Sequence, residues 1–188
     1  MNRQQTQISK FLSYVLRHRP DEIGITLDPQ GWVSIDALLA AASSHGTPIT
    51  REDLELVVSN NSKQRFAISD DGTRIRASQG HSTSVDLGYA ASAPPAVLYH
   101  GTAGSNVDSI RAQGIVRGQR HHVHLSVDTD TAMQVGGRHG SAVVLVVRAG
   151  EMHAAGHEFF LSANGVWLTE HVPALFIDFG PRVDPKAG

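Results

Sequence analysis

The sequence predicts an α+β fold built from two lobes, and three features predict it. Apolar residues in about the first eighty positions follow a mainly helical repeat that ends in one hairpin pattern. After Pro95, short strand-like runs dominate, and a stretch rich in serine, alanine and proline separates the two patterns. The length of 188 residues suits one domain or two small ones. We therefore expect a first lobe over residues 1–82, a linker over 83–95 and a second lobe over 96–188.

The first helix is predicted from five apolar residues at helical spacing: Ile8, Phe11, Leu12, Val15 and Leu16. Thr6 is a candidate N-cap, and Pro20 ends the helix. Three cationic or near-cationic side chains precede the proline, namely Arg17, His18 and Arg19. A helix C-terminus tolerates positive charge, so a solvated last turn is one interpretation and an anion-binding site is the other.

Two further elements are predicted before residue 50. The segment 24–34 has the pattern strand, turn, strand. Ser34 is then a candidate N-cap for a helix over 35–46 that ends at Gly46.

The rest of the first lobe is predicted to be a short helix and a hairpin. Thr50 and Asp53 form a near capping box for a helix over 51–60. A hairpin follows over 65–78, with Asp71-Gly72 as its turn. Helices followed by a two-stranded ribbon indicate a winged-helix-like unit.

The second lobe is predicted to be rich in strands. Six strand-like runs cover residues 96–101, 122–127, 142–149, 158–163, 165–170 and 174–179. Only two helical segments are expected among them, over 105–114 and 130–140. Asn164-Gly165 favours a hairpin between two of the strands.

Composition limits the classes of function. The formal net charge is −2, and charged residues make up 18% of the chain, so no general basic surface for nucleic acid is expected. Any anionic partner must be held by a local cluster. The absence of cysteine excludes disulfides, thiol nucleophiles and cysteine zinc sites. No signal peptide and no apolar span are evident, so we expect a soluble, cytoplasmic protein, with a monomer as the default.

Histidines mark two candidate sites in the second lobe. His100, Gly101 and Thr102 lie where a strand turns toward a helix, and a glycine there lets a ligand approach the backbone. His122 and His124 alternate on one strand and share a face. With His121 they suggest zinc, but one strand supplies only two ligands. Partly buried histidines without metal are therefore preferred, although a carboxylate from elsewhere in the chain would complete a metal site.

Two pairs of basic residues lie on the predicted ribbon. They are Lys63 with Arg65, and Arg74 with Arg76. Taken alone, each pair is most simply interpreted as solvated charge at a strand edge.

Together, these fragments resemble the RNA 2′-phosphotransferases, NAD-dependent enzymes often called tRNA 2′-phosphotransferases. Eight segments carry the resemblance in order: ISKFLSYVLRHRP, GWVSIDALL, KQRFAI, IRASQGHS, LYHGT, RHHVHLS, VGGRHGSAVVLVV and NGVWLTEHVP. Arg19 fills a variable slot of the family's Arg-His-x-Pro motif. The resemblance implies a winged-helix RNA lobe followed by an ADP-ribosyltransferase-like NAD lobe.

The resemblance also implies an activity. The family transfers an internal RNA 2′-phosphate to NAD through an RNA-2′-phospho-ADP-ribose intermediate, giving 2′-hydroxyl RNA, nicotinamide and ADP-ribose 1″,2″-cyclic phosphate. The implied partners are NAD as co-substrate and a tRNA-like RNA. Where the family acts in tRNA splicing, a ligase leaves the 2′-phosphate at the splice junction. No metal is implied, because arginines supply the positive charge.

Residue by residue, the motifs imply three groups of site residues. The catalytic tetrad is Arg17, His18, Arg65 and Arg138. The NAD-binding set contains a His-His-apolar signature at His100, His124 and Val166, together with Gly101, Thr102, His122, Leu125 and Ser126. The candidates for flanking nucleotides are Arg74, Arg76, Gln79, His81 and Ser82.

The chemistry explains why arginines are required. A 2′-phosphate beside a phosphodiester crowds negative charge, since its second pKa is about 6. Arginine stays charged and grips phosphate oxygens in a bidentate fork, which lysine cannot do. His18 is the natural group for proton transfer. This interpretation favours an anion site at the end of the first helix.

Two other functions remain as alternatives. The same lobes are compatible with an ADP-ribosyltransferase acting on terminal phosphates of nucleic acid or on protein. A winged-helix regulator that senses NAD is the non-enzymatic alternative. The candidate recognition helix, residues 51–60, is acidic on balance, which counts against the regulator.

Overall fold

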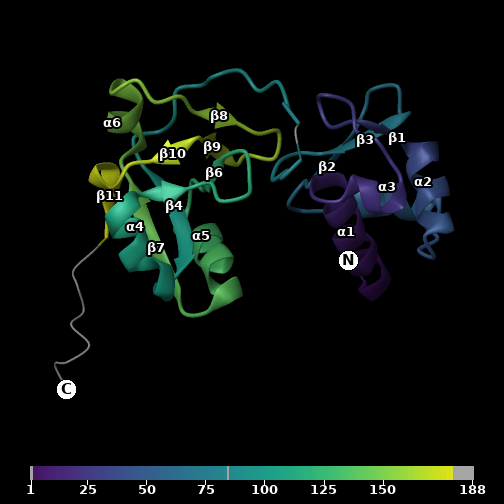
Figure 1. Ribbon diagram of the computed structural model, residues 1–188, viewed down its shortest axis with the longest axis horizontal. Coiled ribbons are helices and arrows are strands. Elements are labelled where there is room, and N and C mark those ends of the chain that lie inside the picture. The colour runs from purple at the N-terminus through teal and green to yellow at the C-terminus, as the bar shows by residue number, and fades with distance from the viewer. Residues whose placement is uncertain (1, 84, 180–188) are drawn as a thin grey trace. The chain divides into compact units, whose positions relative to one another are not determined.

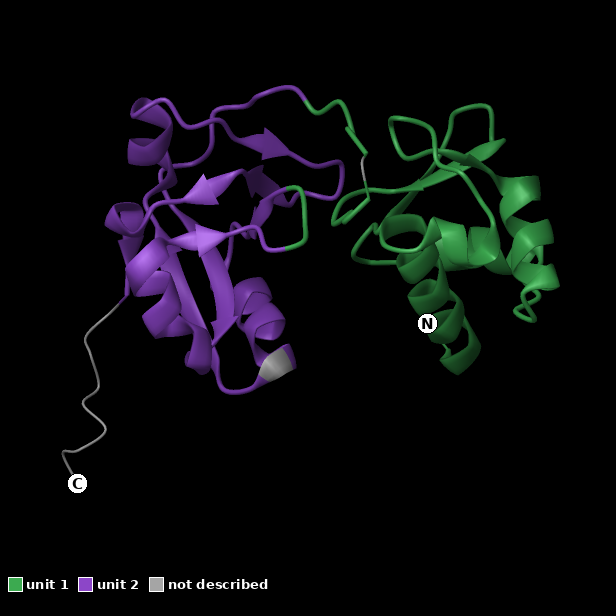
Figure 2. Cartoon of the chain, viewed as in Figure 1, with its two compact units in different colours: residues 1–89, 119–121 green, residues 90–118, 122–188 purple. Residues whose placement is uncertain are grey.

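The computed structural model describes residues 2–83 and 85–179, so the parts of the expected linker and second lobe at Ser84 and 180–188 lie outside it. The chain divides into two compact units (Figure 2). Unit 1 contains Met1–Tyr89 and Gln119–His121, and unit 2 contains Ala90–Gly118 and His122–Gly188. Both mix helices with strands (Figure 1), so the expected α+β class is confirmed.

Unit 1 begins with helix α1 (Arg3–Arg17). Its N-cap is Asn2, whose side chain accepts from the backbone of Gln5 while the Gln5 side chain accepts from the Asn2 backbone. The prediction of Thr6 as the cap is therefore wrong, and its hydroxyl bonds to the Asn2 carbonyl inside the first turn. The predicted apolar face is largely buried, and a 3₁₀-helix, η1 (Pro20–Ile23), follows where the proline was expected to end α1.

The segment 24–34 contains one strand rather than two. Strand β1 (Val33–Ser34) pairs with β3, and no strand forms over 25–28. The carboxylate of Asp28 accepts from the backbones of Gln30 and Trp32, which makes a local turn instead of a second ladder. The prediction of two strands in this segment is therefore wrong.

The N-caps predicted for the other two α-helices of unit 1 are confirmed. Helix α2 (Ile35–Ser44) is capped by the Ser34 side chain. Helix α3 (Arg51–Ser59) is capped by Thr50. Both contribute to the apolar core, which includes Leu38 and Leu54 at 0% exposure.

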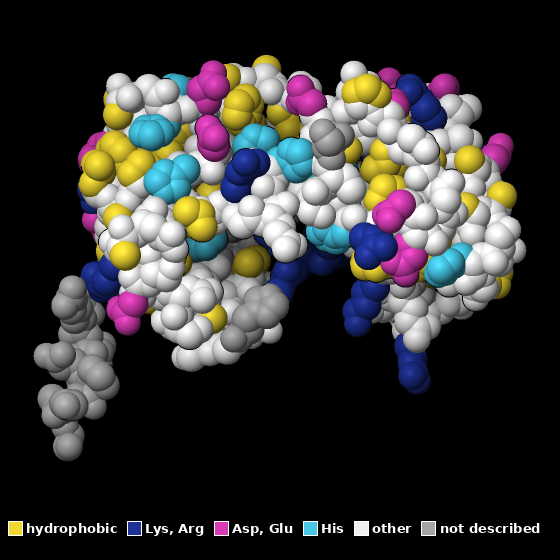
Figure 3. Space-filling model, in the orientation of Figure 1, with side chains coloured by type: hydrophobic (Ala, Val, Ile, Leu, Met, Phe, Trp, Pro, Cys, Tyr) yellow, Lys and Arg dark blue, Asp and Glu magenta, His cyan; other side chains and the backbone are white. Residues whose placement is uncertain are grey.

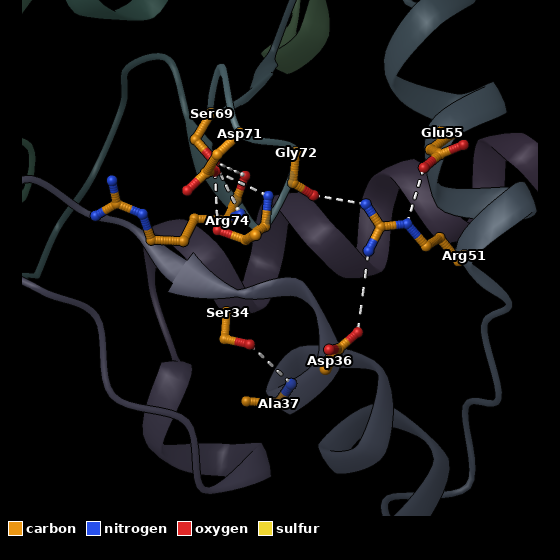
Figure 4. Close-up of polar contacts among 10 residues, drawn as sticks. Ser34, Asp36, Ala37, Arg51, Glu55, Ser69, Asp71, Gly72 and Arg74 are labelled. Carbon is orange, nitrogen blue, oxygen red and sulfur yellow. Dashed lines mark hydrogen bonds and ion pairs between the residues drawn. The ribbon is translucent and has the colours of Figure 1, made fainter.

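The predicted hairpin over 65–78 is present as β2 (Phe66–Ile68) and β3 (Arg74–Ala77), in a sheet of order β1-β3-β2. At the turn, Asp71 accepts from the Ser69 hydroxyl and from the backbone and hydroxyl of Thr73, and these bonds lower its pKa to about 2. Arg51 of α3 donates to the Gly72 carbonyl and pairs with Glu55 (Figure 4). The hairpin tip is thus tied to α3.

The predicted linker 83–95 is divided between the units. On the unit 1 side, the backbone of Asp86 donates to the Pro29 carbonyl, and the Tyr89 hydroxyl donates to the Ser78 carbonyl. On the unit 2 side, the Ser92 backbone donates to the Phe159 carbonyl. These bonds hold the first end of the segment against unit 1 and its second end against unit 2.

Unit 2 contains three small antiparallel sheets among its described residues, with strand orders β11-β7-β4, β6-β9-β8 and β10-β5 (Figure 1). The strands are β4 (Leu98–Ala103), β5 (Ile115–Val116), β6 (Val123–Leu125), β7 (Ala142–Val147), β8 (Phe160–Leu161), β9 (Trp167–Thr169), β10 (His171–Val172) and β11 (Ile177–Asp178). The predicted Asn164-Gly165 hairpin joins β8 to β9, whose residues Leu161 and Trp167 pair.

Unit 2 has three α-helices in the described part of the chain: α4 (Val107–Gln113), α5 (Thr129–Gly136) and α6 (Ala149–Ala154). The first two confirm the predicted segments, but α6 was not expected. It starts directly after strand β7 without a side-chain cap, so the sequence carries no start signal. The expected strand over 174–179 also begins as a 3₁₀-helix, η4 (Ala174–Phe176).

Candidate active site

The end of helix α1 carries the first two predicted catalytic residues. Arg17 is the last residue of α1, and His18 is its C-cap, with a backbone N–H that donates to the Tyr14 carbonyl. Arg19 turns to ion pairs with Asp21 and Glu22. The carboxylate of Asp21 raises the pKa of Arg19, through a hydrogen bond first and then through charge. Arg19 therefore has carboxylate partners of its own, and it differs in this from the predicted catalytic residues Arg17 and His18.

Arg65 is brought to Arg17 by the fold of unit 1. Nη2 of Arg17 donates to the carbonyl oxygen of Arg65 at 3.4 Å. The Arg65 guanidinium donates to Oδ1 of Asn61 at 3.2 Å, and Asn61 is 3% exposed. Gln64 adopts a left-handed backbone (φ 41°) just before this strand. Asn61 is not among the predicted site residues. Its side chain orients the guanidinium of Arg65, which is predicted to bind phosphate.

Ser82 makes two contacts with the end of α1. Its backbone N–H donates to the Arg17 carbonyl at 2.9 Å, and its Oγ lies 3.0 Å from Nδ1 of His18. Ser82, which was predicted to hold a flanking nucleotide, is thus a hydrogen-bonding partner of the first two predicted catalytic residues.

Residues Gln119–His121 belong to unit 1 although their chain neighbours on both sides belong to unit 2 (Figure 2). Nε2 of His121 is hydrogen-bonded to the carbonyl of Thr83, beside Ser82. Burial lowers the pKa of His18, and the positive charges of Arg17 and Arg120 lower it further. Arg120 is thus a further cation near His18. Sequence reasoning missed it because it lies in the RHHVHLS segment, where only the histidines drew attention.

The candidate nucleotide-binding residues are distributed over the face of β3 and the segment after it. The guanidinium carbons of Arg74 and Arg76 lie 5.4 Å and 4.6 Å from the ring centroid of Trp32. Arg74 also pairs with Asp28 at 3.6 Å. Gln79 is partly exposed. Trp32, which is not among the predicted site residues, adds an aromatic ring to this basic surface.

His81 is 3% exposed and lies beside Gly31, where an added Cβ would be 3.3 Å from its Nε2. Burial, followed by the charges of Arg17, His121, His18 and Arg76, lowers the pKa of His81 to about 4. A neutral, enclosed ring offers little surface to RNA, and the contact of His81 with a flanking nucleotide stays a prediction.

In unit 2, the predicted NAD-binding histidines are joined through strands β4 and β6. Nδ1 of His100 lies 3.1 Å from the carbonyl oxygen of His124. The backbones of Tyr99 and Ser126 exchange two hydrogen bonds of 2.8 Å. His100, His124 and Ser126 are therefore close in space, as their assignment to one site requires.

The remaining members of the NAD set differ in exposure. The buried hydroxyl of Thr102 accepts from Asn106 at 3.1 Å. His122 packs against Phe160 with ring centroids 5.5 Å apart. Leu125 faces the core at 1% exposure, and Val166 follows the β8–β9 turn, where its backbone bonds to Ser162. Leu125 is thus a core residue by burial.

Gly101 is required by packing. A Cβ at this position would overlap the carbonyl oxygen of Ala132, and one at Gly136 would lie 2.8 Å from the backbone of Thr102. Helix α5 therefore lies directly against strand β4, with glycine on both sides. The expected reason for this glycine was ligand approach, whereas the structure provides a reason within the protein.

Arg138, the fourth predicted catalytic residue, is exposed and lies in the 3₁₀-helix η3 (Gly137–His139) of unit 2, just after α5. The structure thus brings Arg17, His18 and Arg65 together within unit 1 and places Arg138 in the other unit.

The surface visible in Figure 3 carries charges of both signs. On the visible faces of the described residues, basic and acidic side chains are interspersed (Figure 3). Within residues 2–83 and 85–179, no cluster of three or more histidine and carboxylate side chains is suited to a metal ion. None of the helices in that same part of the chain is both long and apolar enough to cross a membrane.

Comparison with known proteins defines the class. A family model described as "RNA 2'-phosphotransferase, Tpt1 / KptA family" matches residues 3–171. This chain belongs to that family, a family of transferases.

Individual relatives are similar in sequence to this chain over most of their length. A protein of Pseudomonas aeruginosa is 59% identical over 170 residues, covering 90% of this chain and 93% of its own. One from Streptomyces coelicolor is 55% identical over 173 residues, covering 92% and 94%. One from Pectobacterium carotovorum is 50% identical over 184 residues, covering 97% and 99%. Each is named "Probable RNA 2'-phosphotransferase".

Proposed function

We propose that this protein removes an internal 2′-phosphate from RNA by transferring it to NAD. The products are 2′-hydroxyl RNA, nicotinamide and ADP-ribose 1″,2″-cyclic phosphate. The observation that carries the proposal is the convergence of Arg17, His18 and Arg65 within unit 1, from segments far apart in the sequence. Family membership supports the same activity.

The guanidinium groups of Arg17 and Arg65 hold the 2′-phosphate. Each offers several N–H donors and a charge that does not titrate, which suits a crowded phosphoryl group. Asn61 holds the Arg65 guanidinium and so limits its conformations. The nearby positive charge of Arg120 strengthens attraction for the anionic substrate.

The groups of unit 2 suit NAD. His100 and His124 lie on the adjacent strands β4 and β6, Ser126 directly follows β6, and all three present hydrogen-bonding groups. Thr102 lies on β4, His122 directly precedes β6, and Val166 ends the turn between β8 and β9. When bound, NAD supplies a ribose whose anomeric carbon bears a neutral leaving group and whose 2″-hydroxyl is a nucleophile. These residues orient that ribose, which lowers the entropic cost of reaction.

The overall transfer balances without an added oxidant or metal. A phosphate oxygen bonds to the anomeric carbon as nicotinamide leaves with the bonding electrons. The 2″-hydroxyl oxygen then bonds to phosphorus as the bond to the RNA 2′-oxygen breaks, and the hydroxyl proton passes to that oxygen. His18 moves this proton, because its lowered pKa keeps the ring neutral near pH 7. Arg138 stabilises the charge on the phosphoryl oxygens.

Each unit has its own part in the proposed reaction. Unit 1 is the winged-helix-like RNA lobe, and its Trp32, Arg74 and Arg76 hold nucleotides that flank the phosphate by stacking and charge. Unit 2 is the ADP-ribosyltransferase-like lobe. The RNA is tRNA-like, and the protein acts in the cytoplasm as a monomer.

A mass measurement tests the proposal. The protein is incubated with NAD and an oligoribonucleotide that carries one internal 2′-phosphate, beside a matched oligonucleotide with a 5′-phosphate only. We expect the first RNA to lose one phosphate in step with release of nicotinamide, and the loss to require NAD. Retention of the 2′-phosphate would overturn the proposal. A stable gain of ADP-ribose on the 5′-phosphorylated RNA instead would favour terminal ADP-ribosylation.

A further inference from the structure

Ser82 is bound twice to the end of helix α1. Its backbone N–H donates to the carbonyl of Arg17 at 2.9 Å, and its hydroxyl oxygen lies 3.0 Å from Nδ1 of His18. The next residue, Thr83, is held in turn by His121 through its carbonyl oxygen. The segment is therefore anchored on both sides of the hydroxyl, which limits the positions that Oγ can take.

A neutral imidazole carries one N–H, and the partner of one ring nitrogen decides which nitrogen holds it. The groups that face His18 are mainly cations or other imidazoles: Arg17 on its own helix, Arg120 on the 119–121 segment, and His81. None of these three groups is a carboxylate, so none of them would stabilise a charged His18 ring. The Ser82 hydroxyl is the hydrogen-bonding group that reaches Nδ1.

We propose that Ser82 is a positioning residue for His18, accepting a hydrogen bond from Nδ1–H so that the unprotonated Nε2 is available as the base. The inference deepens the proposed function and rests on it for the role of the base. In step two, Nε2 takes the proton of the attacking 2″-hydroxyl and passes it to the departing RNA 2′-oxygen. Nδ1–H stays bonded to Ser82 throughout, so the ring does not turn when it is protonated.

This tautomer is diagnostic because an exposed neutral histidine prefers the proton on Nε2. Nδ1 of His18 must therefore be protonated against the intrinsic preference. The isosteric pair Ser82→Thr and Ser82→Val separates the hydroxyl from shape, since threonine and valine differ only in a hydroxyl and a methyl group. Ser82 is exposed, so its side chain is not part of the core, and Ser82→Ala serves as a second deletion of the hydroxyl.

The test is nitrogen-15 NMR of histidine-labelled protein in the absence of RNA and NAD. Long-range nitrogen–proton correlations give the tautomer of each of the 11 histidines, and His18→Gln identifies the His18 signals. We expect the Nδ1–H form for His18 in the wild type and in Ser82→Thr. In Ser82→Val and Ser82→Ala we expect a shift toward the Nε2–H form. Turnover should fall roughly three- to tenfold in these two variants, as expected for one lost hydrogen bond, mainly in kcat, with Ser82→Thr within about threefold of wild type.

Three results would overturn the inference. They are an Nε2–H tautomer for His18 in the wild type, an unchanged tautomer in Ser82→Val and Ser82→Ala, and a loss of turnover in Ser82→Thr as large as in Ser82→Val. The tautomer is measured without substrate. Failure of the proposed function would therefore show as absent phosphate transfer by the wild type, whatever the NMR result.

Discussion

Nη2 of Arg17 donates to the backbone carbonyl of Arg65 at 3.4 Å, across 48 positions of the sequence. This bond joins the end of helix α1 to the residue that precedes strand β2. One guanidinium is thus tied to the backbone that carries the other. Two side chains suited to phosphate are therefore held near each other by the fold of one unit.

Replacing Arg65 with lysine tests the need for a guanidinium fork. Lysine keeps the charge but not the planar pair of donors, so we expect kcat/KM for 2′-phosphorylated RNA to fall about ten- to hundredfold, the range for losing a hydrogen bond to a charged group. Arg19→Lys is the matched control, because Arg19 pairs with exposed carboxylates. Its kcat/KM should stay within about threefold of wild type. Equal losses in both variants would contradict a specific role for Arg65.

Removing His18 or Arg138 should separate the two chemical steps. The first step expels neutral nicotinamide and needs no proton donor, whereas the second needs proton transfer and charge stabilisation at phosphorus. We expect His18→Ala and Arg138→Ala to accumulate RNA-2′-phospho-ADP-ribose. Gel analysis of the RNA with a radiolabelled NAD detects it. If nicotinamide release stops in both variants and no intermediate forms, this division of roles is wrong.

The charge of Arg120 should contribute to the low pKa of His18. Burial lowers this pKa most, followed by the charge of Arg17 and then that of Arg120, so Arg120→Gln should raise the pKa part of the way toward its usual value of 6.5. The neutral fraction of the ring then decreases at mildly acidic pH, so the acid limb of the kcat profile should move to higher pH. NMR titration of His18 measures the same shift directly. An unmoved pKa in Arg120→Gln would show that the two groups are not coupled.

Buried His81 should make unit 1 less stable in mild acid. Its pKa is about 4 in the folded protein and 6.5 as the reference for the unfolded chain. Between these values the unfolded state binds more protons, so the free energy of unfolding falls as pH decreases and is fully retained above pH 6.5. At about 1.4 kcal/mol per pH unit, the loss by pH 4 is about 3 kcal/mol.

Urea unfolding at a series of pH values measures this effect. In a Trp167→Phe background, fluorescence reports unit 1 through Trp32, since the chain has only two tryptophans. His81→Gln should reduce the slope of stability with pH between 4 and 6.5. A slope equal to that of the background protein would exclude His81 as its source.

Gly101 should tolerate no side chain. A Cβ there overlaps the Ala132 carbonyl of helix α5, so Gly101→Ala must displace the helix or the strand. We expect unit 2 to lose about 2 kcal/mol of unfolding free energy, measured by Trp167 fluorescence in a Trp32→Phe background. Gly104→Ala is the matched control, because its nearest neighbours would lie at 3.6 Å and 3.7 Å. Similar stability of the two variants would contradict the close packing of α5 on β4.

Much of the local structure follows from the sequence alone. Helix α1 ends before Pro20, Ser34 and Thr50 cap their helices, and the Asp71-Gly72 turn joins β2 to β3, all as predicted. Each of these signals acts over a few residues, through a fixed φ angle, a side-chain cap or a turn hydrogen bond. The motifs likewise marked Arg17, His18 and Arg65 as candidates.

Other local features escaped prediction because competing interactions decided them. Asn2 outcompetes Thr6 as the cap of α1 through its reciprocal bond with Gln5, and Asp28 forms a turn where a strand was expected. Helix α6 has no capping side chain and follows directly on a strand.

Only the tertiary structure decided how the candidates are arranged. The contact of Arg17 with Arg65, the bond between Ser82 and His18 across 64 positions, and the presence of Arg120 in unit 1 have no local signal. The bond of Ser82 depends on how the segment after β3 returns to the end of α1, whereas the other two depend on how residues 61–65 and 119–121 pack within unit 1. Spacing along the chain determines which side chains share a helix or strand face, whereas contacts between distant segments arise only when the core packs and brings their backbones together.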